Sequence, residues 1–129
     1  MSFDWSDFLR LAESLARAER ASSLEEAALR SAVSRAYYAA FCASRNHARD
    51  RGGITLTGQA RDHGIVKDYF KYSRVRDHKK IGTRLDRLRD NRNCADYDDD
   101  LQGDLRSLAQ LSLAEAHNIL GLLDKNRPT

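Results

Sequence analysis

Cysteine, proline and long apolar runs are scarce in this sequence. Only two of its 129 residues are cysteines, and one is a proline. Cys42 and Cys94 stand far apart and form no CxxC motif, so we expect two reduced thiols rather than a disulfide scaffold. With only isolated histidines to join them, these cysteines give little support to a structural zinc site. We therefore expect no metal and no other cofactor.

No stretch reaches the roughly 18 consecutive apolar residues that a membrane-spanning helix needs. The first ten residues, MSFDWSDFLR, carry acids where a signal peptide would have a basic and then an apolar run. The sequence therefore predicts a cytoplasmic protein that does not cross a membrane. With 41% apolar residues, residues 1–129 are expected to form one domain, long enough to bury a core but too short for two.

Positive charge is unevenly distributed, although the net charge is only +3. Residues 1–60 carry a net +1, residues 61–92 carry eleven Lys or Arg against five Asp for a net +6, and residues 93–129 carry a net −4. Such a basic block attracts phosphates and gives salt-dependent, sequence-independent binding to nucleic acid. It can equally be a solvated helix face followed by a lysine-rich turn. The side chains that we expect to contact phosphate are Lys79, Lys80, Arg84, Arg87 and Arg89.

Helical periodicity dominates the sequence, and the alternation typical of strands is nearly absent. A first helix has an apolar stripe that includes Phe8, Leu11 and Leu15. Ser22 and Ser23, each followed three residues later by a glutamate, fit a capping box that starts a long second helix. The two glycines of RDRGG are expected to end this helix near residues 49–53.

Three more helices are expected in the second half of the chain. Residues 53–58, GITLTG, are predicted to form a loop, and a third helix follows with apolar positions around Val66 and Phe70. Residues 72–80 are too polar for a core and predict a mobile loop or a frayed end. A fourth helix is expected from about Lys80 toward Cys94, and a fifth after the acidic run that favours a helix N-terminus. The fold class is all-α, an antiparallel helical bundle of about five helices.

Arg92 interrupts an apolar helical face, since Ile81, Leu85 and Leu88 precede it at helical spacing. A charge in such a row needs a partner or a purpose. One interpretation pairs Arg92 with Asp96 one turn later, an ion pair that closes the helix end. The other places Arg92 and Asn93 in a groove at a two-fold interface, where a phosphate or another chain completes the site. Arg89 is expected to face the solvent in either case.

Two adjacent tyrosines, Tyr37 and Tyr38, lie in the long second helix. Neighbours on a helix point about 100° apart, so both cannot face the core in the same direction. We expect one of them to pack in the core and the other to serve a second surface or a gap between neighbouring helices.

The segments SRAYYAAF, DHGIVKDYF and LDRLRDNRNCADYDDD follow one another in an order and spacing that resemble the HEPN superfamily, in particular its small single-domain prokaryotic members. The resemblance covers roughly residues 20–124. It implies an antiparallel helical bundle, a homodimer, an adjacent minimal nucleotidyltransferase as partner and, in many members, a metal-independent ribonuclease that acts as a toxin or a defence effector.

The catalytic motif of that family is an arginine, a polar residue and then a histidine after four to six intervening residues. Arg92 and Asn93 match its first part, but Tyr97 and two aspartates occupy the positions of the histidine. Histidine suits both proton transfers of RNA cleavage because its ordinary pKa lies near working pH, whereas a tyrosine such as Tyr97 is a weak substitute. Arginine holds phosphate but does not carry protons. Phosphate binding should therefore survive better than catalysis.

The sequence and the resemblance together predict an RNA- or nucleotide-associated component of a toxin–antitoxin or defence-type pair, with weak or no ribonuclease activity. One alternative is a catalytically silent interaction module that docks a nucleotidyltransferase through the surface of Tyr38 and Arg92, with Asp96 at the interface. A second alternative is an active metal-independent ribonuclease. A metal-dependent hydrolase is disfavoured, because the run DYDDD is better explained as helix capping than as a ligand set.

Overall fold

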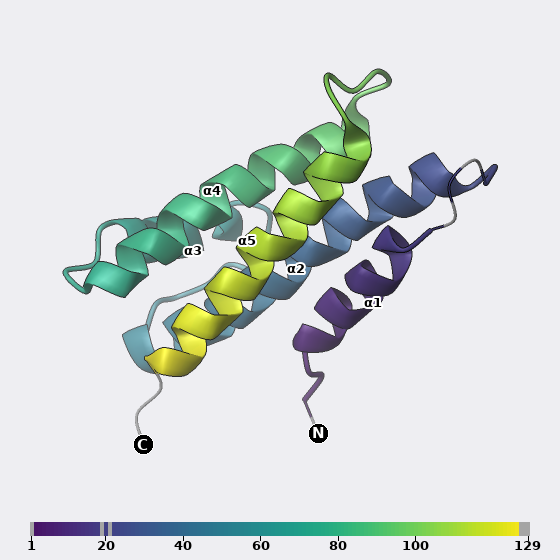
Figure 1. Cartoon of the computed structure of the whole chain (residues 1–129). Coiled ribbons are helices and arrows are strands. Elements are labelled where there is room, and N and C mark those ends of the chain that lie inside the picture. Colours follow the sequence, from purple (N-terminus) through teal and green to yellow (C-terminus); the bar gives the residue numbers. More distant parts are fainter. Residues whose placement is uncertain (1, 19, 21, 127–129) are drawn as a thin grey trace.

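The computed structural model describes residues 2–18, 20 and 22–126. This part of the chain is all α-helical, with five helices and no strand among the described residues (Figure 1). The helices are α1 (Ser6–Ala16), α2 (Glu25–Gly52), α3 (Asp62–Lys71), α4 (Arg76–Tyr97) and α5 (Leu105–Lys125). The predicted fold class, an all-α helical bundle, is confirmed.

The bundle is organised around α2, which contacts each of the other four helices. Figure 1 shows α1, α2, α4 and α5 roughly aligned, with each running opposite to the one before it, while the short α3 lies beside α4. No helix in the described residues is long and apolar enough to cross a membrane.

Small side chains along α2 allow its neighbours to approach closely. Five alanines of this helix are completely buried: Ala32, Ala36, Ala39, Ala40 and Ala48. The space around them is filled by larger buried side chains from α3, α4 and α5, among them Phe70, Ile81, Leu88 and Ile119. Burying a side chain of this size contributes about 1.5–3 kcal/mol, so this core is the main source of stability.

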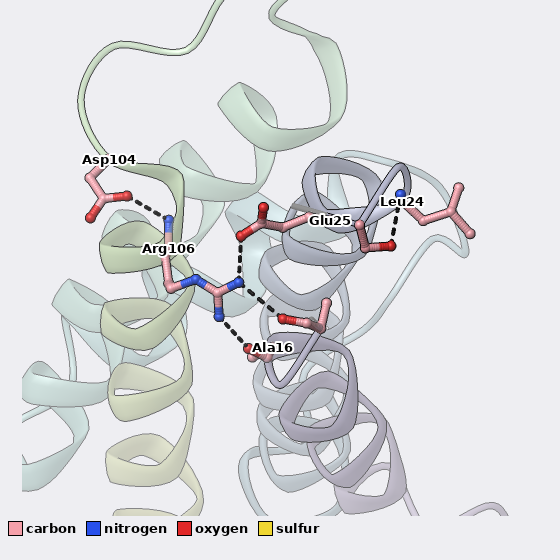
Figure 2. Close-up of polar contacts among 7 residues, drawn as sticks. Ala16, Leu24, Glu25, Asp104 and Arg106 are labelled. Atoms are coloured by element: carbon pink, nitrogen blue, oxygen red, sulfur yellow. Dashed lines mark hydrogen bonds and ion pairs between the residues drawn. The ribbon is translucent and has the colours of Figure 1, made fainter. Parts of the chain in front are cut away.

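Arg106 joins three helices at one end of the bundle (Figure 2). Its guanidinium donates hydrogen bonds to the carbonyl oxygens of Ala16 at 3.2 Å and Ala18 at 3.1 Å, and to Oε2 of Glu25 at 2.6 Å. The last carbonyls of a helix lack partners within the helix, and a cation near them also complements the helix dipole. Arg106 of α5 therefore closes the C-terminus of α1 and holds the start of α2 beside it.

Arg30 of α2 closes the C-terminus of α4 in the same way. Its guanidinium donates to the carbonyl oxygens of Ala95 at 3.1 Å, Asp98 at 2.6 Å and Asp99 at 3.2 Å. The polypeptide turns away from α4 at this point, so these carbonyls would otherwise depend on water. The acidic run after α4 is thus anchored to α2 through its backbone.

The predicted end of α2 is confirmed, but the predicted capping box at its start is wrong. The helix ends at Gly52, and Gly53 adopts a left-handed φ of 64°, which glycine tolerates without steric conflict. At the other end, Leu24 is the N-cap residue and no side chain caps the helix. The hydroxyl of Ser22 accepts a hydrogen bond from the amide of Leu24 at 3.2 Å, so it closes a turn before the helix instead.

The prediction of a loop or frayed end at residues 72–80 is wrong from Arg76 onward, because α4 begins there. His78 explains the early start. Ser73 Oγ hydrogen-bonds its Nδ1 at 3.0 Å, and its buried ring packs 5.2 Å from the ring of Phe70. Burial lowers the pKa of His78, so the neutral ring packs as an aromatic residue would.

The inner face of α1 also differs from the predicted stripe. Leu9 and Ala12 are its buried residues, whereas Leu11 is exposed. Apolar residues cover so wide an arc of this helix that their spacing fits two inner faces, and packing against α2 and α5 selects one of them.

Candidate functional site

Side chains from α2, α3 and α4 meet in one group, which we call the arginine–tyrosine cluster. It consists of Tyr37 and Tyr38 of α2, His63 of α3, and Arg89 and Arg92 of α4. Each of the three sequence segments that resemble the HEPN superfamily contributes to it. Residues that are up to 55 positions apart in the chain are thus brought together by the packing of three helices.

Arg92 is buried within this cluster, with only 7% of its surface exposed. Its guanidinium carbon lies 5.4 Å from the ring centres of both Tyr37 and Tyr38, and 5.9 Å from that of Tyr97. A cation over aromatic faces is attracted by their negative quadrupole, and the attraction strengthens where water is excluded. The aromatic rings therefore replace part of the hydration that Arg92 loses.

The predicted ion pair between Arg92 and Asp96 is present. Arg92 Nη1 lies 3.7 Å from Asp96 Oδ2, which also accepts a hydrogen bond from Ser34 Oγ at 3.2 Å. Arg92 Nε is buried and has no hydrogen-bond partner in the described residues. The charge of Arg92 is thus balanced by one partly exposed carboxylate, while its hydrogen-bonding capacity is incompletely used.

Tyr37 is the core tyrosine of the adjacent pair, being 1% exposed, and Tyr38 is half-buried at the edge. The two rings meet edge to face with their centres 5.3 Å apart. Burial raises the pKa of the Tyr37 hydroxyl well above its usual value, although Arg89 and Arg92 act in the opposite direction. Tyr37 therefore keeps its proton throughout the physiological pH range.

His63 completes the cluster from the first turn of α3. Its ring stacks on Phe41, with centres 4.2 Å apart and planes 10° from parallel, and the Tyr37 hydroxyl hydrogen-bonds its Nδ1. Burial, reinforced by the nearby charges of Arg89 and Arg92, lowers the pKa of His63 to about 4. The imidazole is consequently neutral at pH 7, beside two guanidinium groups.

Asp62 holds the chain in place where His63 enters the cluster. Its Oδ1 accepts hydrogen bonds from the amide of Thr57 at 2.8 Å and from Thr57 Oγ1 at 2.6 Å, and its Oδ2 accepts from the amide of Gly58 at 2.8 Å. These bonds hold the pKa of Asp62 below its usual value. They tie the loop predicted at residues 53–58, which is confirmed, to the start of α3.

His63 is the residue that the motif-based prediction missed. The family motif places its histidine a few residues after the arginine, whereas His63 precedes Arg92 by 29 residues and comes from another helix. Its position beside Asp62 in the segment DHGIVKDYF, at the start of a predicted helix, was the available indication. No spacing rule along the chain reports that α3 packs beside α4.

The predicted phosphate-contacting residues differ in their exposure and in their partners. Arg84 and Arg87 lie against the buried carboxylate of Glu115 on α5, with N–O distances of 3.0 and 3.8 Å. Arg89 is half-buried rather than solvent-facing, and its Nε is buried without a hydrogen-bond partner in the described residues. The two lysines, Lys79 and Lys80, are exposed in the first turns of α4.

The remaining predicted residues lie near the end of α4. Asn93 is half-buried, and Tyr97 is 73% exposed, so its hydroxyl is open to solvent while its ring faces Arg92.

Within the described residues, no group of three or more histidine, cysteine, aspartate or glutamate side chains is placed to hold a metal ion. No protein-family model, curated protein or solved structure matches this chain.

The low pKa of His63 predicts a pH-dependent stability. The unfolded chain protonates this histidine near its ordinary pKa of about 6.5, while the folded protein resists protonation until the pH nears 4. The neutral His63 ring therefore makes its full contribution to the free energy of unfolding above pH 6.5. As the pH falls toward 4, the free energy of unfolding drops by roughly 1–2 kcal/mol, after allowing for solvent screening of the part-exposed ring. Urea unfolding at several pH values should show this loss in the parent.

His63→Gln should flatten the loss between pH 6.5 and 4.5, leaving the smaller share that His78 contributes with the same sign. A variant curve parallel to that of the parent would show that His63 titrates alike in the folded and unfolded chains.

Proposed function

We propose that this protein is a cytoplasmic, HEPN-like component of a prokaryotic toxin–antitoxin or defence-type pair, and that it binds phosphates of RNA or a nucleotide at the arginine–tyrosine cluster. One observation carries the proposal: Arg89 and Arg92 stand beside a neutral histidine, each with a buried Nε that lacks a hydrogen-bond partner in the described residues. Guanidinium groups suit phosphate because they present several donors in one plane.

The charge balance of the cluster supports the same function. Asp96 pairs with Arg92, whereas no carboxylate in the described residues forms an ion pair with Arg89. Such a surplus of positive charge, partly shielded from water, favours an anionic ligand. The half-buried Arg89 would contact the phosphate. The more deeply buried Arg92 would attract the phosphate electrostatically without touching it.

The proposal includes a homodimer and a nucleotidyltransferase partner, as the resemblance implies. Arg92 is too deeply buried to meet a partner protein directly. A docked protein would therefore touch Tyr38, which is half-buried, and Asp96, whose side chain is partly exposed. Such docking and phosphate binding would compete for the same edge of the cluster.

A second candidate function, metal-independent RNA cleavage, is favoured by the position of His63. A neutral imidazole can accept the proton of a ribose 2′-hydroxyl as that oxygen attacks the adjacent phosphorus. The pKa of about 4 makes this ring a weak base, so the cleavage that we expect is slow. The solvent-facing hydroxyl of Tyr97 is the group available to protonate the departing 5′-oxygen.

RNA binding by the parent and by Arg89→Gln tests the proposed phosphate site. We expect a labelled single-stranded RNA to bind the parent and to dissociate as salt rises from about 50 to 200 mM, because bound phosphates release counterions. Arg89→Gln should weaken binding roughly 10-fold and reduce the salt slope by about one. Fluorescence anisotropy measures both quantities.

Arg10→Gln is the matched control, since it removes the same charge from an arginine exposed on α1. Equal affinities of the two variants, or no binding by the parent at low salt, would refute the phosphate site.

Incubating the RNA with the parent protein in the presence of EDTA tests the second function. Slow formation of RNA fragments with 2′,3′-cyclic phosphate ends, absent when His63→Gln replaces the parent, would establish cleavage.

A further inference from the structure

The turn between α3 and α4 presents an aromatic ring to solvent. Tyr72, the C-cap residue that follows α3, is 76% exposed, more than any other large hydrophobic side chain in the described residues. Val75, which precedes α4, is also exposed. The neighbouring Tyr69 and Phe70 pack into the bundle, so the chain turns Tyr72 outward while its neighbours face inward.

This turn is held in one conformation by its own hydrogen bonds. Ser73 Oγ accepts a hydrogen bond from the amide of Val75 at 3.1 Å and hydrogen-bonds Nδ1 of the buried His78 at 3.0 Å. On the other side of Tyr72, the backbone of Lys71 lies against Gly82 of α4. The backbone of Tyr72 is therefore anchored on both sides, so a ligand that contacts its ring costs little backbone conformational entropy.

Basic residues are frequent in the segment that contains Tyr72. Residues 71–80 contain five basic residues and a single acid, Asp77. That acid is already engaged, with Oδ2 lying 3.3 Å from both Lys125 Nζ and Asn126 Nδ2, and Oδ1 lying 3.9 Å from Lys80 Nζ. The exposed basic side chains of this segment include Lys71, Arg74, Arg76 and Lys79, and the nearest preceding acid, Asp68, lies 3.4 Å from Lys67 Nζ.

We propose that the α3–α4 turn is a docking platform for single-stranded RNA, with a base stacked on Tyr72 and the flanking phosphates held by Lys71, Arg74, Arg76 and Lys79. An exposed ring in a segment rich in exposed basic residues matches an unpaired base and its phosphates, because base stacking on an aromatic side chain requires a free base face. A duplex hides its base faces and offers Tyr72 nothing to stack on. A membrane surface is less suited, since Tyr72 and Val75 alone provide little apolar area to insert.

The platform rests on the proposed function for the identity of the ligand, and it adds a second point of contact. His63 in the first turn of α3 and Tyr72 just after its last residue are nine positions apart, so the rise of about 1.5 Å per residue places them roughly 13 Å apart along the helix axis, on opposite sides of the helix. An RNA strand would have to pass around the end of α3 to contact both the platform and the arginine–tyrosine cluster. The platform selects single strands, whereas the cluster binds phosphate.

Tyr72→Ala tests the platform in an anisotropy titration with labelled single-stranded oligoadenylate. We expect this variant to bind roughly 10-fold more weakly than the parent, and Tyr72→Phe to retain the affinity because the ring is conserved. Phe3→Ala is the matched control, since it removes another exposed aromatic ring, one that precedes α1 and belongs to neither proposed site, and its affinity should stay within about twofold of the parent. Circular dichroism verifies that the variants are folded.

Several outcomes would overturn the platform. These are equal affinities of Tyr72→Ala and the parent, an equal loss in Phe3→Ala, binding of a duplex as tight as binding of the single strand, or Tyr72-dependent binding to phosphatidylserine vesicles without RNA binding. The two proposals remain separable. A loss in Arg89→Gln alone refutes the platform and supports the phosphate site, a loss in Tyr72→Ala alone does the reverse, and a parent that binds no RNA refutes both.

Discussion

Gly82→Ala should lower the free energy of unfolding by roughly 3 kcal/mol, equivalent to about 10 °C in Tm for a domain of this size. A Cβ at this position would lie 2.7 Å from the backbone nitrogen of Lys71 and 2.9 Å from its Cα. Backbone atoms cannot rotate away as a side-chain end can. The added methyl group would therefore separate α3 from α4, which contact each other closely here.

Gly121→Ala is the control for Gly82→Ala, because it makes the same chemical change inside another helix. Nothing lies within 4 Å of a Cβ built at Gly121. Alanine costs a helix about 0.5–1 kcal/mol less than glycine, so this variant should be more stable than the parent. Thermal unfolding of both variants decides the matter, and a gain in stability by Gly82→Ala would show that α3 and α4 can separate without loss.

Displacing α3 should also disturb the candidate site. His63 stands at the start of this helix, and the arginines that it faces are on α4. The contact at Gly82 sets the distance between the two helices about two turns from Arg89. We therefore regard Gly82 as a residue that positions the cluster without belonging to it.

Local sequence patterns predicted the helices well wherever apolar spacing or glycine determined them. The end of α2 follows from the glycines at 52–53, and the apolar positions of α3 follow from Val66 and Phe70, both buried. The start of α4 could not be predicted in this way. It depends on a buried neutral histidine, His78, and the sequence around it is polar.

The candidate site could be predicted only where its members lie on one helix. The pairing of Arg92 with Asp96 follows from their separation by one turn, and it is present. That one of the two tyrosines is buried follows from helix geometry, although which one does not. The approach of His63 depends on α3 packing beside α4, a contact between distant segments that no spacing along the chain encodes.

Arg92→Ala should cost roughly 3 kcal/mol in the free energy of unfolding and weaken RNA binding roughly 10-fold. The stability loss is expected because the guanidinium is buried, packs over three tyrosine rings, and leaves Asp96 without its ion-pair partner when removed. Arg92→Lys should lie between this variant and the parent, since an ammonium keeps the charge but loses the planar stacking. Arg87→Ala, at an exposed position of the same helix, should change stability by less than about 0.5 kcal/mol.

Stability alone does not separate the two interpretations of Arg92, because a structural ion pair and a phosphate site both lose stability when the arginine is removed. Asp96→Asn separates them. This change keeps a side-chain acceptor for Ser34 and removes only the negative charge beside Arg92. If Arg92 serves the bundle alone, Asp96→Asn should lose a little stability and leave RNA affinity unchanged.

If the cluster binds phosphate, the two variants should change RNA affinity in opposite directions: Arg92→Ala weakens binding, while Asp96→Asn strengthens it severalfold by removing a competing carboxylate. Asp100→Asn controls for net charge, because it removes the same charge from an exposed position in the same acidic run. We expect its effect on affinity to be less than half that of Asp96→Asn, since Asp96 lies 3.7 Å from Arg92 whereas the exposed Asp100 forms no ion pair with it in the described residues and is screened by solvent. Equal gains in the two variants would mean that only the overall charge matters, and would remove Arg92 and Asp96 from the binding site.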